Sequence, residues 1–178
     1  MGKESDIVGF MHQINKLKTI ERAGWVRRGI ESSESVSDHS NGITILALIL
    51  TPKTGIDSSK VLKMSIIHDW AESKIGDIIP ADGVSKEEKY KLEESAMTEL
   101  IGYLNDGSEL LSLWKEFEVG ETNEAKFVKN LDKLEMMFQA HEYGISQPRV
   151  NLNDFWEYAE KIDFGEVQLI YNQLRNLR

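Results

Sequence analysis

Apolar residues recur at intervals of three and four along most of this 178-residue chain, which is the spacing of one face of an α-helix. Ile7, Met11 and Ile14 begin the first such stripe, within residues 5–18. Capping residues precede the later stripes, and Gly or Pro follows several of them. Only residues 43–50 resemble a strand, and their length and flanking caps favour a helix instead. The pattern predicts an all-α chain.

Capping and turn signals set the expected bounds of the helices. Sequences of the capping-box type occur at 35–38 and 85–88, while 19–35 and 80–85 are rich in Gly, Pro and Ser and are expected to be loops. The expected helices span residues 5–18, 36–51, 59–74, 86–104, 108–118, 123–142, 154–162 and 165–177. No repeat or linker interrupts residues 1–178, so we expect a single domain with a substantial core.

Composition excludes several classes of protein. The chain has no Cys, which rules out disulfides, thiolate nucleophiles and Cys-based metal sites. Its formal net charge of −9 repels a polyphosphate backbone, so a nucleic acid polymer is not an expected partner, whereas a small phosphorylated ligand needs only local cations or a metal. No apolar run approaches the ~20 residues that span a bilayer, and residues 1–10 lack the apolar core of a secretory signal. We therefore expect a soluble, cytoplasmic protein without a membrane partner.

The stretch SIIHDWAESKIGDIIP, residues 65–80, places three ionisable groups within five residues of an otherwise apolar helix. Such groups are costly to bury unless something neutralises them. His68 and Glu72 are four residues apart, and Asp69 and Glu72 three, so on a helix their side chains are neighbours. His68 and Asp69 diverge by about 100° around the axis, yet both can reach one atom over the groove between them.

Two further residues of the same kind lie in apolar helical segments. His39 occurs near the start of one, and Asp132 has Val128 and Met136 as its four-apart neighbours in another. Two imidazoles and two carboxylates suit a divalent transition ion with open positions for water and substrate. The alternative is that each His is a hydrogen-bonded core residue, because convergence in space cannot be read from spacing.

The order His39, His68-Asp69 and Asp132 resembles the defining pattern of the HD-domain superfamily of metal-dependent phosphohydrolases. The surrounding segments are similar to those of its small 5′-deoxynucleotidase branch over roughly residues 5–175. These segments are RAGWVRRGI, ESVSDHS, HDWAESKIGDIIPAD, SKEEK, LWKEFE and EAKFVKNLDKLEMMFQAHEY. The resemblance implies an all-α HD fold, usually a homodimer, that hydrolyses deoxyribonucleoside 5′-monophosphates to deoxynucleosides and phosphate.

The resemblance also implies roles for individual residues. The metal ligands correspond to His39, His68, Asp69 and Asp132. Glu72 matches the catalytic acidic residue, and Asp77 matches a carboxylate associated with the sugar and with preference for deoxyribose. Arg22 and Trp25 match positions near phosphate and nucleotide, and Arg28 matches an arginine common in close relatives. For these residues the alternatives are that Glu72 orients His68, that Trp25 is core or interface packing, and that the arginines belong to a solvated loop.

Three positions depart from the family's pattern. Arg27 stands where relatives often carry an aromatic residue, Gly29 where they often carry Asn, and His141 replaces a small residue. The first two alter the expected nucleotide pocket, so base preference does not follow from the resemblance.

One divalent ion per subunit is the expected cofactor, such as Co, Mn, Zn, Fe or Ni. Two-metal and di-iron HD sites need additional His ligands between the second and last motifs, and this chain has none between Asp69 and Asp132. Two other functions stay open: an HD phosphohydrolase acting on cyclic nucleotides, triphosphates or alarmones, and a non-catalytic nucleotide- or metal-binding module. Glu72 and Asp77 argue against the second, since a binding protein need not keep both.

Overall fold

The structure, a computed structural model, describes residues 6–159 and 161–178. Within these ranges the regular structure is helical, and the only β-type pairing is an isolated bridge between Glu21 and Ser35. The all-α prediction is confirmed. The α-helices are α1 (Ile7–Ile14), α2 (Ala23–Arg28), α3 (Val36–Leu50), α4 (Ser58–Ile67), α5 (Glu72–Ile75), α6 (Lys86–Ile101), α7 (Ser108–Val119), α8 (Asn123–Ser146), α9 (Asn153–Ala159) and α10 (Gly165–Arg175). Single 3-10 turns lie at Asn15–Lys18, Thr51–Lys53 and Pro80–Asp82.

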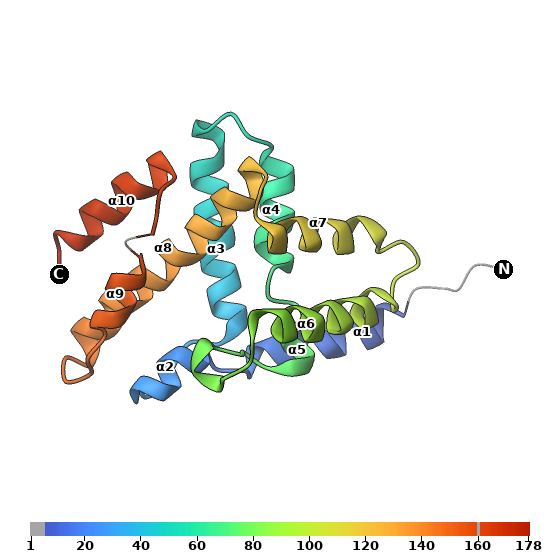
Figure 1. Cartoon of the computed structure of the whole chain (residues 1–178), viewed down its shortest axis with the longest axis horizontal. Helices are drawn as coiled ribbons and strands as arrows, with labels where there is room; N and C mark the ends of the chain where they lie inside the picture. Colours follow the sequence, from blue (N-terminus) through green and yellow to red (C-terminus); the bar gives the residue numbers. More distant parts are fainter. Residues whose placement is uncertain (1–5, 160) are drawn as a thin grey trace.

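Helices α3, α4 and α8 form the centre of the molecule. Figure 1 shows α3 and α4 side by side, and α8 contacts both of them. Helices α1, α5 and α6 cover one end of this group, while α9 and α10 pack along α8. Fully buried apolar side chains fill the contacts, among them Ile43 and Ala47 of α3, Met64 of α4 and Leu131 of α8. Burying a large side chain of this kind contributes about 1.5–3 kcal/mol, so the crossing of these helices is firmly held.

Local capping sets the starts of two helices as the sequence predicted. Ser35 Oγ accepts the Asp38 N–H while the Asp38 carboxylate accepts the Ser35 N–H. Ser85 and Glu88 make the same reciprocal pair at the start of α6. Both predicted capping boxes are confirmed, because they depend only on residues three positions apart.

The predicted helix 59–74 is wrong in its second half. Helix α4 ends at Ile67, and the backbone then forms three-residue turns, with Trp70 N–H donating to Ile67 and Glu72 N–H to Asp69, both at 3.1 Å. The short helix α5 follows. Nδ1 of His68 lies 2.9 Å from the Ser65 carbonyl, a group that an unbroken helix offers to the N–H of residue 69. His68, Asp69 and Glu72 therefore occupy a tight corner instead of one straight helix.

The predicted loop 19–35 is also wrong in part, because residues 23–28 form α2. This helix has only six residues and no local apolar stripe. It is held by distant contacts: the Asp77 carboxylate accepts the Ala23 N–H at 2.8 Å, and Trp25 is buried. Gly29 ends the helix with φ of 80°, the left-handed conformation that glycine adopts without strain. Smaller differences are a 3-10 turn inside the predicted loop 80–85 and the end of α8, which lies at Ser146 and not at Glu142.

Among the described residues, no helix is both long enough and apolar enough to cross a membrane.

Candidate metal centre and substrate pocket

Two buried imidazoles face each other at the centre of the fold. His39 comes from the first turn of α3, and His68 follows the last residue of α4; their ring centroids are 5.8 Å apart. Nδ1 of His68 faces the Ser65 carbonyl, which can only accept, so Nδ1 carries the proton. Nδ1 of His39 likewise faces a carboxylate, with Glu135 Oε2 at 2.5 Å. In each ring Nε2 is therefore the nitrogen left to bind an ion, as in metal-binding imidazoles.

Two carboxylates approach these Nε2 atoms. Asp69 Oδ2 lies 3.1 Å from Nε2 of His68 and 4.0 Å from Nε2 of His39. Asp132 Oδ1, from α8, lies 3.1 Å from Nε2 of His39. One ligand-type atom from each of His39, His68 and Asp69 falls within 4.8 Å of the others. The structure thus brings three of the four predicted ligands into one cluster and sets the fourth against His39.

The charges within this cluster favour the binding of a cation. Burial raises the pKa of Asp69, but His68, Arg22 and His39 outweigh it and hold that pKa well below its usual range. Burial also raises the pKa of Asp132, but its hydrogen bond to His39 and the charges of His39, His68 and Arg22 together outweigh burial and lower that pKa. Burial and Arg22 act to lower the pKa of His39, yet Asp132 and Glu135 raise it to about 10. These carboxylates stabilise positive charge on the His39 imidazole, and a divalent ion at Nε2 can supply that charge by displacing the proton there.

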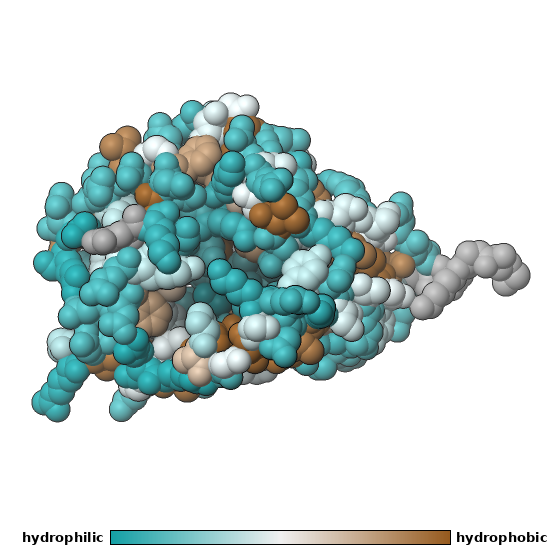
Figure 2. Space-filling view, in the orientation of Figure 1, coloured by the Kyte–Doolittle hydropathy of each residue, from teal (hydrophilic) through white to brown (hydrophobic). Residues whose placement is uncertain are grey.

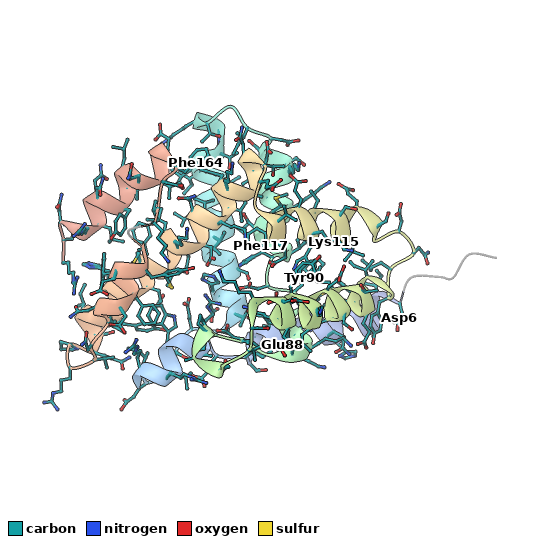
Figure 3. All side chains as sticks on the ribbon, viewed as in Figure 1. Asp6, Glu88, Tyr90, Lys115, Phe117 and Phe164 are labelled. Atoms are coloured by element: carbon teal, nitrogen blue, oxygen red, sulfur yellow. The ribbon has the colours of Figure 1, made fainter. Side chains whose placement is uncertain are left out.

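Unpaired polar atoms point to the same conclusion. Nε2 of His68 and Oδ2 of Asp69 are buried and, although only 3.1 Å apart, make no hydrogen bond, and Oε2 of Glu72 is buried without a partner as well. Such an arrangement is rare in folded proteins unless an ion or water completes it. Phe117 of α7, which is labelled in Figure 3, packs edge-on against the His68 ring with centroids 5.5 Å apart. The residues present therefore fit a divalent ion held by nitrogen and oxygen donors.

Glu72 begins α5 beside this cluster and is 3% exposed. Burial, together with the charges of Asp69 and Asp77, raises its pKa well above the ordinary value for Glu, while Arg22 acts in the opposite direction. Two neighbouring carboxylates therefore differ in character, since Asp69 is held ionised and Glu72 is disposed to carry a proton. Such a difference is typical of sites that separate acid from base roles.

Arg22, at the start of α2, and Asp77, just after the end of α5, lie beside the cluster. Nη1 of Arg22 lies 3.7 Å from Oδ2 of Asp69 and 3.7 Å from Oδ2 of Asp77. Asp77 also accepts the Ala23 N–H, so it fixes the start of α2 in addition to facing the pocket. Trp25 is 2% exposed, donates through Nε1 to Glu34 and stacks on Phe155 with centroids 4.1 Å apart. Trp25 is therefore part of the packed wall of the site.

A pocket of about 580 Å³ opens beside the cluster, a size typical of small-ligand sites. Figure 2 shows a hollow lined largely by hydrophilic residues on the corresponding face of the molecule. Six of the eight predicted site residues line the pocket, and His39 and His68 lie beneath it. The six are Arg22, Trp25, Asp69, Glu72, Asp77 and Asp132.

Sequence reasoning missed Glu135 and Lys89. Glu135 occurs three residues after Asp132, so the helical spacing that placed one carboxylate also placed the other on the same face. Lys89 belongs to the SKEEK segment; its Nζ donates to the Ile78 carbonyl at 2.9 Å and lies 3.4 Å from Glu93. Glu34 also approaches the Glu135 side of His39. Nothing in the sequence indicates that this glutamate turns inwards.

The other two histidines of the chain, and Arg27 and Arg28, lie outside the cluster. His12 is exposed on α1, and His141 lines a separate, smaller pocket near the end of α10. Arg28 pairs with Asp154 of α9, and Arg27 pairs with Asp82. These ion pairs close the rim of the main pocket, so Arg27 and Arg28 are part of its walls.

Comparison with known proteins identifies relatives along most of the chain. A family model described as HD domain matches residues 14–168. A protein of Danio rerio named 5′-deoxynucleotidase HDDC2 is 44% identical over 140 residues, which cover 78% of this chain and 70% of that one. The Dictyostelium discoideum protein of the same name is 43% identical over 167 residues, covering 86% and 87%.

Solved structures share the fold. A protein of Pyrococcus horikoshii has a TM-score of 0.83 at 30% identity, with 96% of this chain and 99% of that one covered. A protein of Magnetospirillum magnetotacticum, described as a predicted metal-dependent phosphohydrolase, has a TM-score of 0.72 at 26% identity, covering 96% and 89%.

Proposed function

The chain belongs to the HD domain family, and on this premise we propose that it hydrolyses deoxyribonucleoside 5′-monophosphates to deoxynucleosides and phosphate. Relatives named 5′-deoxynucleotidases, 43–44% identical over most of the chain, support this activity. The observation that carries the proposal is the ligand cluster of His39, His68 and Asp69, which opens beside Glu72 and Asp77 into a pocket of nucleotide size.

The metal would be held by His39, His68, Asp69 and Asp132. A divalent ion there supplies Lewis-acid polarisation of the phosphoryl group and lowers the pKa of water at the site. Glu135 and the Ser65 carbonyl hold the two imidazoles in the orientation that offers Nε2. The expectation of one transition ion per chain is tested by elemental analysis of the purified protein.

Arg22 and Glu72 would act on the phosphate. Arg22 is held as a cation by Asp69 and Asp77, although its burial opposes the charge, and it lines the pocket beside the cluster. A guanidinium in that place can pair with two phosphate oxygens and stabilise the charge that grows as the P–O bond breaks. Glu72, with its raised pKa, is placed to deliver a proton to the departing 5′-oxygen.

Asp77 would contact the sugar. Its side chain lines the pocket five residues after Glu72, and only one of its oxygens has a hydrogen bond to Ala23. The other oxygen would then lie against the sugar, at the side where a ribose carries a 2′-hydroxyl that deoxyribose lacks.

The proposal also includes the oligomeric state of the protein and its location in the cell. The homodimer implied by the resemblance is tested by light scattering of the purified protein, and the expected cytoplasmic location by cell fractionation. Neither affects the chemistry assigned to the pocket.

Phosphate release from a panel of nucleotides tests the proposed function. The chelator-treated protein is supplied in turn with Mn²⁺, Co²⁺, Mg²⁺, Zn²⁺, Ni²⁺ and Fe²⁺, and Asp69→Asn serves as the control without a complete ligand set. The proposal expects release from deoxyribonucleoside 5′-monophosphates that depends on the added ion. Turnover confined to cyclic nucleotides, triphosphates or alarmones would assign a different phosphohydrolase activity. Tight nucleotide binding without turnover would assign a binding module.

A further inference from the structure

Helix α9 places two aromatic side chains, Phe155 and Tyr158, in the wall of the substrate pocket. They are three residues apart on a short helix, so they project from the same face. Neither belongs to a segment that carried the family resemblance. No role in the chemistry described above uses them.

The aromatic part of the pocket lies along α8, away from the ligand cluster. Asp132 and Met136 both line the pocket and are four residues apart on α8, so they are separated by about 6 Å along the helix axis. Helix α9 packs on α8 and lies beside its C-terminal half in Figure 1. A ligand whose phosphate is at Asp132 therefore extends along α8 towards Met136 and the α9 aromatics.

Phe155 is fixed in place from α2. Its ring stacks on Trp25 with an interplanar angle of 23°, and the Arg28 guanidinium lies 5.9 Å from its centroid. The neighbouring Asp154 forms an ion pair with the same Arg28. Gly24 lies under the ring, where an added Cβ would be 3.4 Å from Phe155 Cζ. These contacts make the first turn of α9 a rigid extension of the pocket wall.

Tyr158 forms the open edge of this wall. It is 50% exposed, so it is available to a ligand without any rearrangement of the core. Ile79 and Pro80 add apolar surface to the lining of the same pocket.

We propose that Tyr158, backed by the Phe155–Trp25 stack, is the residue against which the nucleobase lies, so that α9 makes the enzyme select nucleotides over other sugar phosphates. The inference rests on the proposed nucleotidase function and adds the recognition of the base to it. An aromatic ring stacks on any base, and such contacts commonly account for about tenfold or more in affinity.

The test compares a deoxyribonucleoside 5′-monophosphate with 2-deoxyribose 5-phosphate, which has the same phosphate and sugar but no base. In Tyr158→Ala the ratio of kcat/KM for the nucleotide to kcat/KM for the sugar phosphate should fall about tenfold or more, while Tyr158→Phe keeps it. Phe138→Ala is the matched control, because Phe138 is a partly exposed aromatic of α8 that does not line the pocket. It should keep the wild-type ratio.

A second measurement is independent of catalysis. Calorimetric titration with a free deoxynucleoside, which has a base and no phosphate, should show binding to the wild type that weakens about tenfold in Tyr158→Ala. An unchanged ratio and unchanged deoxynucleoside affinity in that variant would overturn the inference, as would a wild type that does not distinguish the two substrates. Failure of the proposed function itself looks different, because the wild type would then release phosphate from neither substrate.

Discussion

Glu135 Oε2 lies 2.5 Å from Nδ1 of His39, while Asp132 Oδ1, one turn earlier on the same helix, lies 3.1 Å from Nε2. One face of α8 thus contacts both nitrogens of a buried imidazole that belongs to α3. The ring can neither flip nor tilt without losing one of these contacts. The position of the α3–α8 crossing therefore sets the orientation of a proposed metal ligand.

Removing Glu135 should weaken metal binding. In Glu135→Ala, Nδ1 of His39 loses its partner, and we expect the affinity for a divalent ion to fall about 10–100-fold. Glu135→Gln, which can still accept the hydrogen bond, should show a smaller loss. Calorimetric titration of the chelator-treated protein with Mn²⁺ measures both. Glu142→Ala, at an exposed position of the same helix, is the control. Wild-type affinity in Glu135→Ala would show that the contact does not support the ligand.

Gly42 leaves space for the Glu135 side chain. Replacing Gly42 with Ala should therefore destabilise the fold, which is the opposite of the usual effect of this substitution in a helix. A Cβ at residue 42 would lie 2.6 Å from Glu135 Oε1 and 2.8 Å from its Cγ, so Gly42→Ala must displace that side chain. Gly→Ala within a helix ordinarily stabilises by about 1 kcal/mol. Here we expect Gly42→Ala to lower both the melting temperature and the Mn²⁺ affinity. Gly144→Ala on α8, where the new Cβ meets nothing within 4 Å, should raise the melting temperature instead. A stabilised Gly42→Ala with normal metal affinity would contradict this reading of the crossing.

Features that depend on neighbouring residues were predictable from the sequence. The capping boxes at Ser35 and Ser85 and the buried stripes of α3 and α8 follow from spacings of three and four residues. The four candidate ligands were found for the same reason, since each interrupts an apolar helix. The family resemblance implied that these four residues bind one metal ion, and the structure adds the distances between them.

Features that depend on distant contacts were not predictable. Helix α2 exists because Asp77, more than fifty residues away, accepts the Ala23 N–H. The corner after Ile67 depends on the contact of the His68 ring with the Ser65 carbonyl, which the spacing of apolar residues does not predict. Glu135 is one of many acidic residues on helix faces, and only the crossing of α3 and α8 distinguishes it from a solvated one.

The titration of Glu93 should make the free energy of unfolding of the metal-free protein fall as pH rises. Burial raises the pKa of Glu93 from the usual 4.5 to about 7, Lys89 opposes the shift and Glu118 adds to it. Between these pH values the folded state keeps a proton on Glu93 that the unfolded state has released. The contribution of this proton to the free energy of unfolding is therefore full below pH 4.5 and lost by about pH 7.

Thermal unfolding in the presence of a chelator at pH 5, 6 and 7 measures this dependence. The decrease in melting temperature across the window should be smaller in Glu93→Gln than in the wild type, because the amide does not titrate. Glu87→Gln, at an exposed position of α6, is the control and should follow the wild type. Equal decreases in Glu93→Gln and the wild type would show that Glu93 is ionised throughout the window.

Asp77 has two assigned tasks that substitutions can separate. Asp77→Asn retains an oxygen that can accept the Ala23 N–H, whereas Asp77→Ala loses it and should destabilise the fold by about 1 kcal/mol. If the carboxylate also contacts the sugar, both variants should change the ratio of deoxyribonucleotide to ribonucleotide turnover. Parallel assays with matched 2′-deoxy and 2′-hydroxy monophosphates measure that ratio. An unchanged ratio in both variants would leave Asp77 with the α2 contact alone.

Glu72 combines burial, a raised pKa and an unpaired oxygen directly beside the ligand cluster. The four proposed ligands do not include it, so its removal should leave the ion in place. It begins α5 after the corner at His68, and that corner turns its carboxyl group towards the pocket. A protonated carboxyl in this position can complete the departure of the 5′-oxygen, which is a poor leaving group without a proton.

We therefore expect Glu72→Ala to lower kcat by roughly 10²-fold or more, the usual effect of losing a positioned acid–base group. The dissociation constants of Mn²⁺ and of a deoxyribonucleoside 5′-monophosphate should change little, because the substitution removes a proton donor and not a binding contact. Calorimetry of both ligands on the variant, paired with its rate of phosphate release, makes the comparison. Loss of Mn²⁺ binding would make Glu72 a ligand or an essential support for one. A near-normal rate would place the proton transfer on another group, and Lys89, which lines the same pocket and whose charge acts on Glu72, would be the next group to replace.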